Sequence, residues 1–219
     1  MRREVSLADI SDGKLYDLND MVRADAQGCS GCSACCRGMG SSVVLDPLDL
    51  YRMARHLKTA PRQLLAGPVA LGVVDGLVLP HLNMDGEGEQ CPFLGPDGRC
   101  RVYEARPGIC RIFPLGRFYE NGSFRYFLQT RECPSRSRTK IRVRKWVDTP
   151  DLGQYESFVA QWHYFLLELQ ERPGMPEDVE QSRRISMELL TEFYLREYDE
   201  GIDFYEQFAQ RLKAAGGKG

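Results

Sequence analysis

The sequence predicts an α+β protein. A small cysteine-rich metal-binding domain of short strands and helices, residues 1–146, is followed by a helical extension, residues 147–219, packed on it. All eight cysteines lie in the first part, and four of them fall within Cys29–Cys36. The first part carries 22 basic and 16 acidic residues, a net charge of +6, whereas the second carries 7 and 15, a net charge of −8. Apolar residues recur at helical spacing through most of the second part.

The first part is expected to consist of short elements divided by turns. The run Ser-Val-Val-Leu at residues 42–45 predicts a short strand. Asp46 followed by proline is typical of a helix N-cap and first helical position, so we expect a helix over 47–58. A second proline predicts another short helix over 61–65.

Two dipeptides favour β-hairpins in the first part. Asp75-Gly76 interrupts a weakly alternating run over residues 69–82, and Asn121-Gly122 lies between the runs 117–119 and 124–128. These residue types accept the positive φ angles of a two-residue hairpin turn. Residues 140–147 alternate between basic and apolar residues, which predicts an edge strand.

The second part is expected to contain three helices, over residues 155–169, 177–198 and 204–212. Its large apolar residues recur three or four positions apart, which is the spacing of one helix face. Pro173-Gly174 ends the first helix. The stripe on that helix indicates a packed core rather than a cofactor site. Its members are Tyr155, Phe158, Trp162, Phe165 and Leu169.

Composition narrows the class of protein. Hydrophobic residues make up 42% of the 219, enough for a packed core, and the net charge of −2 does not favour a nucleic-acid partner. No run approaches the roughly 18 consecutive apolar residues of a membrane span. The first residues, Met-Arg-Arg-Glu-Val, do not resemble a secretory signal. We therefore expect a cytoplasmic protein with no membrane partner, whose thiols stay reduced instead of forming disulfides.

The cysteine cluster predicts a site for a soft metal. Cys29-Ser-Gly-Cys32-Ser-Ala-Cys35-Cys36 places three candidate ligands at successive two-residue gaps. This spacing is typical of the bacterial ferredoxin loop, in which a remote Cys-Pro supplies the fourth ligand of a [4Fe–4S] cluster. Cys133-Pro134 is such a pair, although Cys36 has no counterpart in that loop. The spacing favours [4Fe–4S] over Zn²⁺ as the cofactor.

The remaining cysteines are widely spaced, so only the fold can bring them together. A turn at Pro96-Asp97-Gly98 is expected to place Cys91 and Cys100 on adjacent arms. Two arrangements stay open: two separate sites, or one compact multi-metal centre. A structural metal without chemistry is another alternative, and Cys100 or Cys133 can also be a buried thiol that binds nothing. The candidate ligands are Cys29, Cys32, Cys35, Cys36, Cys91, Cys100, Cys110 and Cys133.

Two arginines lie close to the outlying cysteines in sequence. A centre with four thiolate ligands carries net negative charge with either cofactor. Arg106 and Arg111, which is adjacent to Cys110, are therefore expected to balance that charge and donate hydrogen bonds to sulfur. Glu104 is a candidate partner for Arg106, and the alternative is an ordinary surface ion pair.

The cysteine motifs resemble those of the YkgJ-type cysteine-cluster (CxxCxxCC) family. The resemblance rests on Cys-x2-Cys-x2-Cys-Cys followed by Cys-Pro-Phe-Leu, Cys-x-Val-Tyr-Glu-x-Arg-Pro and Cys-Arg-x-Phe-Pro, and spans about Cys29 to Pro134. It implies a zinc- or iron-chelating domain of unestablished activity. Flagellin lysine N-methylases look like larger relatives with a similar cluster. This likeness implies, as an alternative, a protein-lysine N-methylase-like enzyme that uses S-adenosylmethionine.

A basic run supports a third hypothesis, a zinc-stapled adaptor for nucleic acid or protein. The alternative for this run is a solvated edge strand protected by its charge, or a docking surface for the acidic helices. His81 is a further possible ligand, whereas His56 and His163 are expected to be structural. The basic residues are Arg131, Arg136, Arg138, Lys140, Arg142, Arg144 and Lys145.

Overall fold

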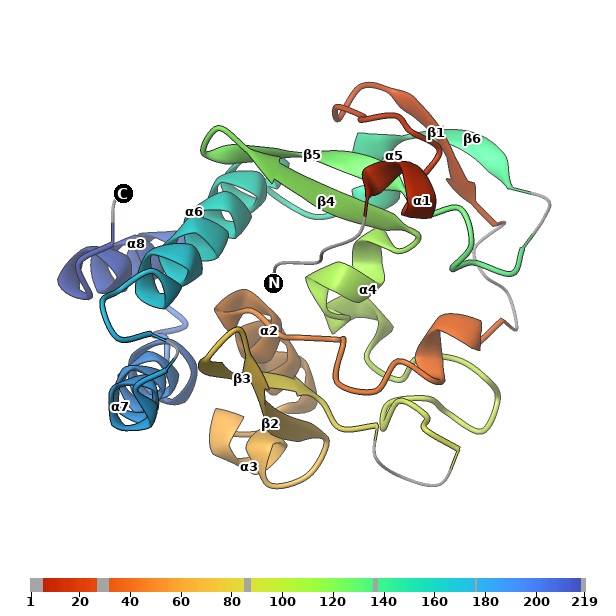
Figure 1. Cartoon of the computed structure of the whole chain (residues 1–219). Helices are drawn as coiled ribbons and strands as arrows, with labels where there is room; N and C mark the ends of the chain where they lie inside the picture. The colour runs from red at the N-terminus through yellow and green to blue at the C-terminus, as the bar shows by residue number, and fades with distance from the viewer. Residues whose placement is uncertain (1–5, 27–31, 85–87, 136–137, 176, 218–219) are drawn as a thin grey trace.

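The computed structural model has the α+β class that the sequence predicts (Figure 1). Its described strands form antiparallel pairs: β1 (Met21–Asp25) with β6 (Thr139–Arg142), β2 (Val69–Val74) with β3 (Leu77–Leu82), and β4 (Leu115–Glu120) with β5 (Ser123–Leu128). The structure describes residues 6–26, 32–84, 88–135, 138–175 and 177–217.

Helices surround these strand pairs, short in the first part of the chain and longer in the second. The α-helices are α1 (Leu7–Ile10), α2 (Pro47–Leu57), α3 (Pro61–Leu65), α4 (Gly108–Ile112), α5 (Val143–Val147), α6 (Leu152–Gln170), α7 (Val179–Leu190) and α8 (Phe204–Ala214). Two 3-10 turns, η2 (Ala34–Cys36) and η3 (Tyr103–Ala105), and a π-helical turn, η4 (Thr191–Leu195), complete the set.

Capping residues, prolines and turn dipeptides correctly predicted two helices and two hairpins of the first part. Asp46 caps α2 by accepting a hydrogen bond from the backbone N–H of Asp49 at 2.8 Å, and the helix ends before Lys58 in the left-handed region. α3 has the bounds expected for it. Both hairpins form, and their turn residues adopt the positive φ angles that the dipeptides predict, for example 47° at Asp75 and 74° at Gly122.

The strand predicted over residues 42–45 is wrong. Only an isolated bridge forms there, between Val44 and His81. The N–H of Leu45 donates to the carbonyl of Pro80, but Pro80 has no N–H to continue the ladder.

The edge strand predicted over 140–147 is wrong beyond Arg142. There β6 ends and α5 begins. Val143 and Val147 are both fully buried, whereas Lys145 between them is exposed. A helix allows this pattern, because a strand would turn Lys145 to the same face as the two valines. The N–H of Val143 donates to the carbonyl of Asp20, which ties the first turn to the chain before β1.

Helices α6 and α8 confirm two of the helices expected in the second part. The helix expected over 177–198 is α-helical only through α7 and continues as the π turn η4. The aromatic stripe is core, as predicted. The rings of Phe158 and Phe208 have their centroids 4.6 Å apart, and those of Trp162 and Phe193 are 5.1 Å apart.

The second part packs on the first through one shared hydrophobic core. In Figure 1, α6 lies beside the β4–β5 hairpin and α7 beside β3. The N–H of Val78 in β3 donates to Ser186 Oγ of α7 at 2.9 Å. The hydroxyl of Tyr194 donates to the carbonyl of Leu45 at 2.9 Å. The division into residues 1–146 and 147–219 stays a prediction, and its boundary falls inside α5.

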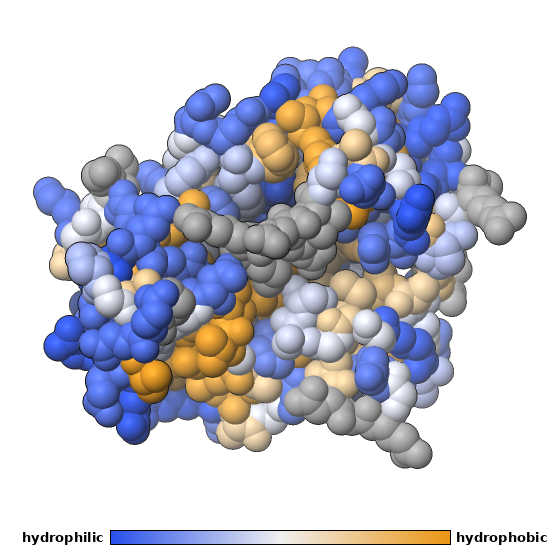
Figure 2. Space-filling view, viewed as in Figure 1, coloured by the Kyte–Doolittle hydropathy of each residue, from blue (hydrophilic) through white to orange (hydrophobic). Residues whose placement is uncertain are grey.

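One face of the molecule shows an apolar patch where the β2–β3 hairpin meets α7 (Figure 2). On β2, Leu71 is 49% exposed and Val73 is 76% exposed. Among the described helices, none is both long and apolar enough to cross a membrane.

Candidate metal centre

The 3-10 turn η2 carries Cys35 and Cys36 and is bonded to the segment that carries Cys91. The N–H of Cys91 donates to the carbonyl of Cys36 at 2.8 Å. Beside this bond, Arg37 forms a bridge with Gln90, and its Nη1 donates to Gln90 Oε1 at 2.8 Å. These bonds hold the end of the cysteine cluster next to Cys91.

The turn at residues 96–98 forms as predicted and places Cys91 and Cys100 on adjacent arms. Leu94 and Cys100 form an antiparallel bridge. The N–H of Gly95 donates to the carbonyl of Arg99 at 2.7 Å, and Gly98 adopts a φ of 75° within the turn. Cys91 is buried, and Cys100 is half-buried.

Cys110 lies in the short helix α4, which is held at its far end by side chains. Arg111 donates from Nη1 to the carbonyl of Asp148 at 2.9 Å and from Nη2 to the carbonyl of Glu104 at 2.8 Å. Trp146 Nε1 donates to the carbonyl of Ile112 at 2.9 Å. Arg111 therefore binds backbone carbonyls of two other segments, one before and one after Cys110 in the chain.

Five thiols from these segments act on one another through their charges. Burial raises the pKa of Cys91, Cys100 and Cys110, and charge on neighbouring thiols raises each further. A hydrogen bond between Cys35 and Cys36 raises the pKa of Cys35 and lowers that of Cys36. Every pair among these five interacts, so the fold gathers them into one group, the five-thiol group.

The five sulfur atoms do not surround a single point. Among the described residues, no three His, Cys, Asp or Glu side chains are spaced to hold one metal ion. Ligands of one tetrahedral Zn²⁺ ion would have sulfur atoms about 3.8 Å apart, given Zn–S bonds of about 2.3 Å. The donor set is that of a soft metal, but holding a single ion requires the thiol side chains to rotate.

Arg106 brings positive charge to the five-thiol group. Its charge lowers the pKa of both Cys35 and Cys100, partly offsetting the other effects on these thiols. Its guanidinium lies 4.3 Å from the centre of the Tyr103 ring, and its buried Nε has no hydrogen-bond partner among the described residues. Arg106 and Arg111 thus have different environments, one facing thiols and the other backbone carbonyls.

Three other predicted cysteine ligands are not among the five thiols. Cys32 is exposed, Cys133 is half-buried after β5, and Cys29 lies outside the described residues. His81 is buried in β3, with its Nδ1 2.9 Å from the carbonyl oxygen of Leu82. His163 stacks on Tyr119 with ring centroids 3.5 Å apart.

Sequence reasoning missed Asp49, which is buried beneath α4. Its Oδ1 accepts a hydrogen bond from the N–H of Gly108 at 2.7 Å. An acid three residues after the N-cap Asp46 is a sequence signal for a capping box, but nothing in the sequence links it to Gly108.

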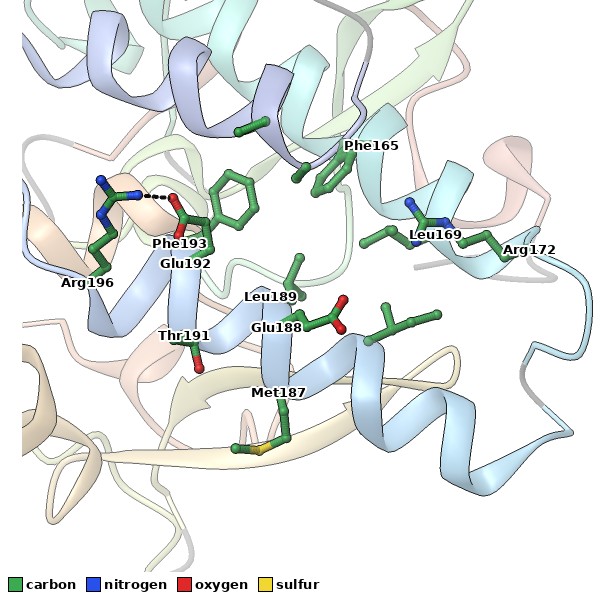
Figure 3. Close-up of a pocket in the computed structure, with 13 residues that line it drawn as sticks. Phe165, Leu169, Arg172, Met187, Glu188, Leu189, Thr191, Glu192, Phe193 and Arg196 are labelled. Carbon is green, nitrogen blue, oxygen red and sulfur yellow. Dashed lines mark hydrogen bonds and ion pairs between the residues drawn. The ribbon is translucent and has the colours of Figure 1, made fainter.

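An apolar cavity is lined by residues of the helices in the second part. Its volume is about 560 Å³, and it lies between α6, α7 and α8 (Figure 3). Phe165, Leu169 and Phe193 line it, and at one side Arg196 pairs with Glu192 at 2.6 Å. No cysteine lines this cavity, so it is not part of the metal centre.

Comparison with known proteins identifies the segment that carries these thiols. Residues 28–134 match the family model CxxCxxCC, described as "Putative zinc- or iron-chelating domain". Neither the curated proteins nor the solved structures searched contain a match to the chain. The matched range includes the whole five-thiol group and Arg106. Residues 28–134 of the chain thus match the CxxCxxCC family of zinc- or iron-chelating domains.

Proposed function

We propose that this protein binds a metal centre through the five-thiol group, with [4Fe–4S] favoured over Zn²⁺. One observation carries the proposal: Cys35, Cys36, Cys91, Cys100 and Cys110 come from separate segments, yet every pair interacts by charge. Mutual repulsion makes such a group costly as bare thiolates. A bound soft metal removes that cost because it takes thiolates as ligands.

The spacing of the thiols supports a cluster over a single ion. The sulfur atoms are near one another but not at the spacing of ligands on one ion. In a [4Fe–4S] cluster each of the four cysteine thiolates binds a different iron atom, so their sulfur atoms lie farther apart than the ligands of a single ion do. The Cys-x2-Cys-x2-Cys spacing supports the same choice. When bound, such a cluster supplies electron transfer or a structural cross-link.

The remaining cysteines and Arg106 have supporting roles in this proposal. Cys29, Cys32 and Cys133 are further ligands, at the same centre or a second one. Arg106 balances the charge of the ligated thiolates, since its charge already favours ionised Cys35 and Cys100. Arg111 secures the backbone around Cys110.

Metal analysis of anaerobically prepared protein tests this proposal. We expect a brown protein that contains iron and acid-labile sulfide, with a broad visible absorption that is lost on exposure to air. Cys91→Ser and Cys110→Ser should each reduce the metal content. A colourless wild-type protein that retains zinc after anaerobic reconstitution with iron and sulfide would overturn the preference for iron, and one that holds neither would overturn the proposal.

A further inference from the structure

We propose that Asp49 is a positioning residue that places Cys110 in the metal centre. This inference rests on the proposed function, because it treats Cys110 as a ligand. Asp49 does not touch the metal in this proposal. It acts by holding the start of α4, two residues before Cys110.

The helix that carries Cys110 is too short to hold its own shape. α4 has five residues, whereas isolated helices shorter than about 12–15 residues are marginal in water. Its N-cap, Pro107, makes no side-chain capping hydrogen bond. The position of Cys110 therefore depends on what the neighbouring elements contribute.

Asp49 supplies the contact that α4 lacks at its start. Its side chain is buried, at 5% exposure, and both oxygens are used. Oδ1 accepts from the N–H of Gly108 at 2.7 Å, and Oδ2 accepts from the N–H of Asp46 at 3.2 Å. Because Asp49 belongs to the 11-residue helix α2, whose apolar face is buried in the core, this contact ties α4 to a stable element.

The opposite side of Gly108 is closed by Tyr155 of α6. A Cβ atom at residue 108 would overlap the Tyr155 hydroxyl. That hydroxyl accepts a hydrogen bond from Arg117 Nη2 at 2.7 Å, so it is itself fixed. Gly108 is thus held between a carboxylate and a hydroxyl, while Arg111 and Trp146 hold the other end of the helix.

The contact uses both oxygens of the Asp49 side chain as acceptors, although burial and the nearby Asp46 charge raise the pKa of this carboxyl to about 8. Both groups that face Asp49 are N–H donors, and each needs an acceptor. An asparagine has the same size but offers one acceptor oxygen and one NH₂ donor. In Asp49→Asn, either Gly108 or Asp46 therefore loses its acceptor inside the protein, and the start of α4 is released or strained.

Alkylation of the metal-free protein tests the positioning role directly. Each cysteine of the wild type and of Asp49→Asn is alkylated with iodoacetamide, and the rates are read by peptide mass spectrometry. We expect Cys110 to react several-fold faster in the variant, with the rate at Cys91 unchanged. Loss of the Asp49 charge by itself also favours the Cys110 thiolate, so hydrogen exchange is measured on the same proteins, and the amides of α4 should exchange faster in the variant. The matched control is Asp46→Asn, which lies at the same helix start, keeps an N-cap acceptor and has no bond to α4.

Metal affinity gives a second readout that a merely structural role would not move. Chelator competition on the reconstituted proteins should show affinity about 10- to 100-fold lower for Asp49→Asn. Asp178→Ala removes the N-cap of α7, and so lowers stability by about 1 kcal/mol, but it should leave the affinity unchanged.

The outcomes separate the two proposals. An unchanged Cys110 rate, an equal rise at every cysteine, or a faster Cys110 rate with unchanged exchange at the α4 amides overturns the positioning role. An affinity loss of the same size in Asp178→Ala also overturns it. If the wild type holds no metal but both Cys110 and the α4 amides react faster in Asp49→Asn, the proposed function fails and the hold of Asp49 on α4 stands.

Discussion

Individual side chains at the five-thiol group have opposing effects on the pKa values of the thiols. Burial and neighbouring thiols raise the pKa of Cys91, Cys100 and Cys110, which disfavours the thiolate forms that bind metals. The hydrogen bond from Cys35 lowers the pKa of Cys36, and Arg106 favours ionised Cys35 and Cys100. Metal binding depends on the balance between these effects.

Replacing Arg106 should weaken metal binding. Arg106→Gln removes the positive charge near Cys35 and Cys100 but keeps a polar side chain of similar length, so we expect affinity about 10-fold lower in chelator competition. Arg125→Gln, which removes only the exposed pair with Glu120, is the control. Equal affinities for the two variants would contradict the charge-balancing role.

His163 should make the folded state sensitive to acid. Burial lowers the pKa of His163 to about 4, below its ordinary value of 6.5. Between these two values the unfolded chain binds a proton that the folded chain does not, so the free energy of unfolding falls as pH decreases from 6.5 toward 4. Urea unfolding at pH 7 and pH 4.5 should show a smaller loss for His163→Phe, which keeps an aromatic ring on Tyr119. Equal losses in the two proteins would exclude this role.

At the level of elements, a helix of the second part accepts a hydrogen bond from a strand N–H of the first part that points away from its paired strand. β3 pairs with β2 along one side. On its other side it has the bridge to Val44 at one end, and the N–H of Val78 donates to Ser186 Oγ of α7. Ser186 is buried and also donates to the carbonyl of Ser182 at 2.7 Å. One hydroxyl therefore joins the hairpin to the helix.

Ser186→Ala should cost about 1–3 kcal/mol, because it leaves the buried N–H of Val78 without an acceptor. Urea denaturation measures the loss. Hydrogen exchange should show faster exchange at Val78 than in the wild type, with the amides of α2 unaffected. Ser157→Ala, on α6 beside a surface hollow, serves as a control, and an equal loss there would argue against a specific bond.

At the level of the whole molecule, the cysteine domain and the helical extension share polar contacts as well as a core. Arg117 donates to Tyr155, Tyr126 donates to Glu156 at 3.0 Å, and Tyr194 donates to Leu45. The family match ends at residue 134, and the partners of these groups lie beyond it, so residues outside the match cover buried groups within it. The methylase and adaptor hypotheses stay predictions.

A fragment of residues 1–146 should therefore not fold cooperatively in the absence of metal. It loses the partners of Arg117, Tyr126 and Val78, at about 1–3 kcal/mol for each buried group left unpaired. This loss approaches the typical stability of a domain, about 5–15 kcal/mol. Urea unfolding followed by circular dichroism should give no sigmoidal transition for the fragment, and a transition like that of the full chain would show that the first part is independent.

The sequence by itself determined the features that depend on neighbouring residues. Asp46 and the proline after it start α2, and Asp75-Gly76 and Asn121-Gly122 close the hairpins, because caps and tight turns depend on the conformations of a few adjacent residues. The cysteine spacing likewise indicated a soft-metal site, and the family match bears this out.

Only the tertiary structure decided which distant groups meet. It gathered Cys35 and Cys36 with Cys91, Cys100 and Cys110, and placed Asp49 beneath α4. It also made residues 143–147 a helix, which buries Val143 and Val147 while leaving Lys145 exposed, despite their alternating pattern. Such choices depend on packing between segments far apart in the chain, which local spacing does not encode.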